Sequence, residues 1–104
     1  MGRLQKRLLL HEKLVSILGS SNVYFQPPAN VQMKFPCIIY KRNGDNPQYA
    51  DNGPYRNTQR YQVTHVDTDP DSGVPDKIAQ LPLCSNDRFY EADNLNHDVY
   101  SLFF

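Results

Sequence analysis

The most strand-like part of the chain is a continuous run of six apolar residues, Phe35-Pro36-Cys37-Ile38-Ile39-Tyr40, bounded by Lys34, Lys41 and Arg42. A run with no polar side predicts a strand that is buried on both faces. Pro36 is compatible with this because it lies near the start of the strand, where a missing N–H is tolerated. We expect the first helix to cover one face of this strand and another part of the chain to cover the second face.

Residues 3–18 predict an amphipathic helix, because apolar side chains recur there at helical spacing. Gly19 supplies a left-handed stop directly after it. The basic side chains of this segment lie mostly off the apolar stripe. The stripe expected to face the sheet consists of Leu4, Leu8, His11, Val15 and Leu18, widened by Leu14 and Ile17.

The rest of the chain alternates short strand patterns with one short helix. The helix begins near Pro75, buries Ile78 and Leu81, and ends at Pro82. Strand patterns cover residues 23–25, 59–67, about 88–93 and 97–104, with a hairpin turn at 94–96. This order predicts an α+β fold: a mostly antiparallel sheet with an N-terminal helix and one short helix packed on it, in a single domain of residues 1–104.

Two segments carry residue types that are common at protein interfaces. A long loop is predicted at 43–58, about twice the usual hairpin connection, and it contains Tyr49, Tyr55 and Arg56. The chain also ends on an apolar strand, which would be a liability if it were loose. We expect this strand to be paired in the sheet with both faces covered, or to be buried against a neighbouring subunit.

Charge is divided unevenly along the chain, although the formal net charge is zero. Residues 1–42 carry seven Lys/Arg and one Glu, whereas residues 43–104 carry four Lys/Arg and ten Asp/Glu. If the fold keeps the two halves apart, copies of the chain can meet head to tail through surfaces of opposite charge. If the sheet mixes the two halves, the field cancels.

One segment, Asp67–Gly73, alternates Asp at three positions, as a calcium-binding loop does at its start. The match fails at the sixth position, which holds Ser72 instead of Gly, and at the twelfth, which holds Ile78 instead of Glu. A solvated turn with capping Asp residues is therefore favoured over an ion site.

Catalysis has little support in the sequence. The three histidines are isolated, and Cys37 lies inside an apolar strand, where a reactive thiolate is disfavoured. Nucleotide-binding and acyl-transfer motifs are absent from the sequence. No stretch approaches the ~18 apolar residues of a membrane span. We expect a protein that is not an enzyme, with no cofactor, no metal and no membrane partner.

Nucleic-acid binding is an alternative to self-assembly. The first helix is basic, and several arginines lie near tyrosines, residue types that can stack on bases. These residues are Arg42, Arg56 and Arg60 with Tyr40, Tyr55 and Tyr61. The balanced overall charge and the lack of a recognition motif weigh against this alternative.

The chain resembles the small tail-completion proteins of long-tailed bacteriophages, the tail terminators of the lambda type. The resemblance runs over nearly the whole chain and rests on strands and turns rather than on a catalytic motif. It is carried by residues 19–28 (GSSNVYFQPP), 35–40 (FPCIIY), 60–64 (RYQVT) with 69–71 (DPD), and 88–98 (RFYEADNLNHD).

The resemblance implies an α+β fold and a six-membered ring that caps the tail tube, ends tube polymerisation and docks the filled head. The implied partners are the chain itself, the tail tube protein and a head-completion or connector protein, in a virion assembled in the host cytoplasm. DNA would pass through the ring without sequence-specific contact. A connector ring at the same joint stays an alternative. From the basic helix, the loop and the apolar end we predict as interface residues Arg3, Arg7, Tyr49, Tyr55, Arg56, Phe103 and Phe104.

Overall fold

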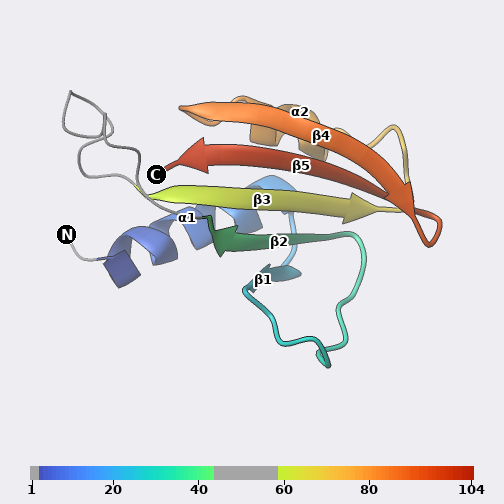
Figure 1. Ribbon diagram of the computed structural model, residues 1–104, viewed down its shortest axis with the longest axis horizontal. Helices are drawn as coiled ribbons and strands as arrows, with labels where there is room; N and C mark the ends of the chain where they lie inside the picture. The colour runs from blue at the N-terminus through green and yellow to red at the C-terminus, as the bar shows by residue number, and fades with distance from the viewer. Residues whose placement is uncertain (1–2, 44–58) are drawn as a thin grey trace.

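The computed structural model describes residues 3–43 and 59–104, with five strands in one sheet of order β1-β2-β3-β5-β4 (Figure 1). The elements are α1 (Arg3–Leu18), β1 (Val23–Phe25), β2 (Cys37–Arg42), β3 (Arg60–Asp67), α2 (Val74–Ala79), β4 (Cys84–Ala92) and β5 (Leu95–Phe103). Strand β1 pairs with β2 in parallel, and all other neighbours pair antiparallel. The predicted α+β fold is confirmed.

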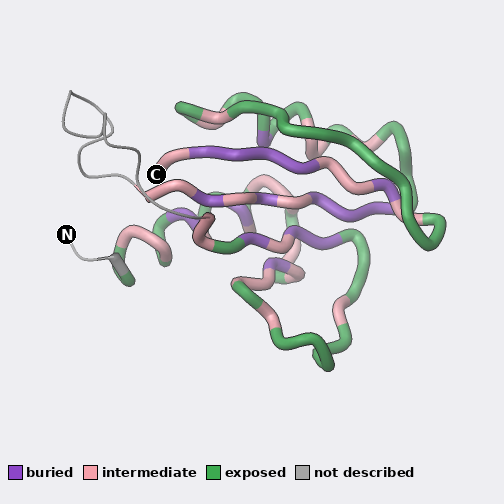
Figure 2. Tube along the Cα trace, in the orientation of Figure 1, coloured by how far each residue is buried: buried purple, intermediate pink, exposed green. Residues whose placement is uncertain are grey.

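Both helices pack on the same face of the sheet. Strand residues that point to this face alternate along each strand, and they meet Leu10 and Leu14 from α1 and Ile78 from α2. Figure 2 shows the buried positions concentrated on the central strands. The strand residues of this core are Val23, Ile38, Tyr40, Tyr61, Val63, Tyr100 and Leu102. As predicted, α2 buries Ile78 and packs Leu81 partly against the core.

The buried side of α1 agrees with the predicted stripe in the second half of the helix and differs in the first half. Leu14 is fully buried, and Val15, Ile17 and Leu18 pack partly against the core. Leu4 and Leu8, however, are exposed, and Leu10, which the stripe omitted, is fully buried. The i, i+4 pair Leu10–Leu14 therefore faces the sheet, because leucines occupy more than one side of the first half of the helix.

The second face of the sheet carries no helix within the part of the chain that the structure describes. Cys37, Val66 and Val99 lie on this face and are nevertheless buried, on strands that have neighbours on both sides. As expected, α1 covers one face of β2. On the second face Cys37 is fully buried and Ile39 partly buried.

The last two strands form a hairpin with a two-residue turn. Asp93 and Asn94 have positive φ angles of 54° and 63°, the conformation of the tight turn that matches the twist of a hairpin. The predicted turn at 94–96 is therefore too late, and Leu95 and Asn96 already belong to β5. Strand β4 also begins earlier than predicted, at Cys84, with an irregular register between Asn86 and Arg88.

The apolar end of the chain is paired on both sides, as expected, because β5 lies between β3 and β4. Phe104 extends this pairing: its N–H donates to the carbonyl of Gln59 at 3.0 Å, and the Gln59 N–H donates back at 3.1 Å. The side chains of Phe103 and Phe104 are half-buried.

Candidate subunit interface

The sheet order keeps the basic and acidic halves of the chain apart. The basic first part forms α1 and the β1–β2 edge, whereas the hairpin of β4 and β5 at the opposite edge holds four of the ten late acidic residues: Asp87, Glu91, Asp93 and Asp98 (Figure 1). Four more lie at the end of β3, in the turn after it and in α2: Asp67, Asp69, Asp71 and Asp76. Strands β2 and β3 pair across the boundary between the two halves, and α1 also contacts α2. The two edges of the sheet nevertheless carry unlike charge, since basic residues predominate in α1 and β2 and acidic residues predominate in the hairpin of β4 and β5.

Arg7, a predicted interface residue, is held inside the subunit. Its guanidinium lies 4.3 Å from the ring centre of Phe25 and donates a hydrogen bond of 3.3 Å to the hydroxyl of Tyr40. The same hydroxyl lies 2.7 Å from Nδ1 of His11. Burial, and then the charge of Arg7, lower the pKa of His11, so its imidazole is neutral at pH 7 and shares a neutral hydrogen bond with the hydroxyl of Tyr40.

The other predicted interface residues are placed only in part. Arg3 is the first residue of α1. Phe103 ends β5, and Phe104 packs partly against the core. Tyr49, Tyr55 and Arg56 lie outside the described residues.

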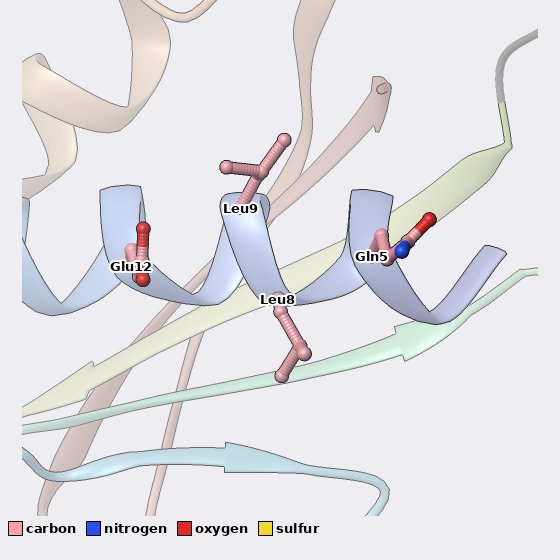
Figure 3. Close-up of a pocket in the computed structure, with 4 residues that line it drawn as sticks. All are labelled: Gln5, Leu8, Leu9 and Glu12. Carbon is pink, nitrogen blue, oxygen red and sulfur yellow. The ribbon is translucent and has the colours of Figure 1, made fainter. Parts of the chain in front are cut away.

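Helix α1 exposes a cluster of leucines that sequence reasoning assigned to the buried side or passed over. The exposed fractions are 58% for Leu4, 46% for Leu8 and 41% for Leu9. Leu8 and Leu9 line a shallow depression with Gln5 and Glu12 (Figure 3). The sequence contained a clue, since leucines at positions 4, 8, 9, 10 and 14 cover more of the helix circumference than one buried stripe needs.

A second exposed surface lies at the opposite edge of the sheet. We call residues 86–98, the hairpin formed by most of β4 and the start of β5, the hairpin arm. Strand β4 is an edge strand, and all of its residues after Cys84 are exposed. Phe89 is 55% exposed and Tyr90 38% exposed. Because adjacent residues point to opposite faces, the arm presents an aromatic ring on each side.

The register assigns these two rings to faces. Residues that are paired directly across neighbouring strands share one face of the sheet. Phe89 of β4 pairs with Asp98 of β5, and Asp98 pairs with His65 of β3. His65 pairs with Ile38 of the core, so Phe89 lies on the helix side of the sheet. Tyr90 lies on the other side, where it stacks on His97 with ring centres 4.5 Å apart. Arg88 lies over the Tyr90 ring at 5.1 Å.

His65 is a buried histidine at the centre of the sheet, with 1% of its side chain exposed. Its Nε2 lies 3.5 Å from a carboxylate oxygen of Asp67, but neither ring nitrogen makes an aligned hydrogen bond with the described residues. Burial lowers the pKa of His65, and the nearby carboxylates of Asp67 and Asp98 oppose that shift only in part. The imidazole is therefore neutral at pH 7.

The acidic segment after β3 forms successive turns. One carboxylate oxygen of Asp67 accepts the N–H of Asp69 at 2.9 Å, and one of Asp69 accepts the N–H of Asp71 at 2.9 Å. These carboxylates hold the backbone of the turn. Across residues 3–43 and 59–104, no group of three His, Cys, Asp or Glu side chains is arranged to hold a metal ion.

Both thiols are poorly suited to nucleophilic chemistry. Burial, and then the charge of Asp67, raise the pKa of Cys37 to about 11. Burial, followed by the charge of Asp87, also raises the pKa of Cys84. Both thiols therefore stay protonated at neutral pH.

Comparison with known proteins gives no relative: no protein-family model, curated protein or solved structure matches the chain. None of the described helices is long and apolar enough to cross a membrane.

Proposed function

We propose that the chain is a structural protein of a long-tailed bacteriophage virion that acts at the head–tail joint. It forms a ring on the finished tail tube, with six copies as the resemblance to tail terminators implies. The ring blocks further addition of tube protein and offers a docking surface to the filled head. The mechanism is steric and electrostatic, requires no cofactor, and operates on particles assembled in the host cytoplasm.

The observation that carries this proposal is the separation of charge across the sheet. A subunit with a basic edge and an acidic edge can bind the next copy through unlike surfaces, and such heterologous contacts close into rings when the rotation allows it. The exposed leucines of α1 and the exposed aromatic rings of the hairpin arm add apolar surface at separate places on the molecule.

A head-completion or connector ring at the same joint would use the same features, so the position of the ring in the virion separates these two functions. The nucleic-acid alternative has lost part of its basis. Tyr40 and Tyr61, two of the three tyrosines proposed to stack on bases, are 0% and 1% exposed and belong to the core. A base cannot reach their ring faces in the folded subunit.

The proposal is tested by adding purified protein to tail tubes polymerising from the tube protein of the phage that encodes this chain. We expect tubes to become shorter as the protein concentration rises, with a ring at one tube end in electron micrographs. Unchanged tube lengths and bare tube ends would contradict the assignment as a terminator. A ring found instead at the head portal of assembled particles would favour the connector function.

A further inference from the structure

The helix layer leaves part of its own face of the sheet uncovered. Cys84, at the start of β4, packs against the core beneath the helices. Farther along the same face, Asn86, Phe89 and Glu91 are exposed. In Figure 2 this strand is exposed along almost its whole length, although α2 lies behind part of it (Figure 1). An aromatic ring on an uncovered sheet face is the kind of surface on which a helix packs.

Helix α1 carries the complementary feature on its outer side. It buries Leu10 and Leu14 against its own sheet and still exposes Leu4, Leu8 and Leu9. An amphipathic helix needs only one apolar face for its own subunit, so the second apolar surface is available to another molecule.

The two surfaces also match in charge. Within α1, four basic residues accompany one acidic residue, Glu12. Within the hairpin arm, four acidic residues accompany one basic residue, Arg88. Lys13 on the helix and Glu91 on the helix side of the arm are both exposed. Opposite charges around apolar contacts favour this pairing, whereas helix against helix or arm against arm would bring like charges together.

We propose that the outer face of α1 in one copy packs against the helix side of the hairpin arm in a second copy, with Leu8 and Leu9 against Phe89 and Lys13 near Glu91. The neighbour's helix then extends the helix layer over the uncovered end of the sheet. Because the two surfaces differ, the contact is heterologous and repeats around a ring. This inference rests on the proposed self-assembly and names the surfaces that carry it.

The experiment measures the mass distribution of purified full-length protein against concentration for the wild type and surface variants. Leu8→Glu and Phe89→Glu should each raise the concentration for half-assembly roughly tenfold or more, because each brings a buried charge into the contact. Two matched controls replace exposed apolar residues of the β1–β2 connection: Val31→Glu for the leucine and Phe35→Glu for the aromatic residue. They should assemble like the wild type.

A charge exchange between the two surfaces distinguishes a lost contact from a folding defect. Lys13→Glu and Glu91→Lys should each weaken assembly, and the double variant should recover it, which a folding defect does not predict. If the wild type assembles and the variants assemble equally well, the interface is overturned and the proposed function stands. If the variants assemble normally but no longer bind tail tubes, these surfaces bind the tube protein and not a second copy of the chain. A wild type that stays monomeric both alone and with tail tubes overturns the proposed function and the interface together.

Discussion

The Nδ1 atom of His11 on α1 lies 2.7 Å from the hydroxyl oxygen of Tyr40 on β2. Arg7, one turn earlier on the helix, donates to the same hydroxyl. This fully buried tyrosine therefore links the first helix to the sheet at its basic edge, close to Phe25. The link fixes how α1 sits on the sheet and, with it, which leucines remain outside.

Replacing Tyr40 with Phe removes this hydroxyl and should lower the free energy of unfolding by about 1–2 kcal/mol, since two hydrogen-bonding partners lose it. Urea denaturation measures the change. The matched control is Tyr24→Phe, whose hydroxyl accepts the exposed N–H of Lys34 and should matter by less than about 0.5 kcal/mol. Equal effects of the two substitutions would show that the His11–Tyr40 link does not stabilise the fold.

Ile78 is the residue through which α2 enters the core, and it is fully buried. Ile78→Ala should cost about 3 kcal/mol, because a cavity remains between the two helices and the sheet. Lys77→Ala, on the exposed side of the same helix, should change stability by less than about 0.5 kcal/mol in the same denaturation assay. A small loss at Ile78 would mean that α2 contributes little to the core.

His65 should make the fold less stable in mild acid. Its pKa in the folded protein lies below the ordinary value of 6.5, because the imidazole is buried. The unfolded chain therefore binds protons first as the pH falls, and the stability present above pH 6.5 is lost below it. Between pH 7.5 and 6.0 this histidine accounts for up to about 0.8 kcal/mol of that loss.

The comparison of His65→Leu with the wild type isolates this contribution, because His11, whose pKa is also lowered, remains in both proteins. We expect a shallower decline of stability with falling pH in the variant. If the wild type and His65→Leu decline in parallel, His65 is not held neutral by burial.

The two cysteines should react slowly with an alkylating reagent at pH 7.5 in the native protein. Cys37, with its pKa near 11, should be the slower of the two, since Cys84 is only half-buried. Mass spectrometry of timed samples resolves the two sites, and denaturant should make both react quickly. Rapid labelling of Cys37 in the native state would reopen a nucleophilic role.

The sequence predicted some elements of the fold correctly and others only in part. The bounds of α1 and the presence of a strand after Pro36 followed from helical periodicity and a continuous apolar run. The burial of Leu10 in place of Leu4 and Leu8 did not follow from it, because the first half of α1 carries leucines on several sides and tertiary contacts decide which of them is buried. The hairpin turn was placed a residue late because Asp93 and Asn94, rather than Asn94 and its successors, adopt positive φ angles.

The interface was harder to predict than the fold. Arg7 is among the predicted interface residues and Tyr40 among the tyrosines that could stack on bases, but the two side chains bind one another inside the subunit. Conversely, Phe89 belongs to an edge strand and stays exposed on the helix side of the sheet, which the sheet order shows and the residues of its own segment do not. Exposure depends on which elements cover which face, and periodicity within one segment does not contain that information.

The central claim is that this chain assembles with copies of itself, and native mass spectrometry of the purified protein, alone and with tail tubes, tests it most directly. We expect a discrete closed oligomer, with six copies giving about 72 kDa from a chain of 12.0 kDa. The oligomer should dissociate at high salt, because unlike charges meet at its contacts. A monomer at every concentration, both alone and with tail tubes, would contradict the claim.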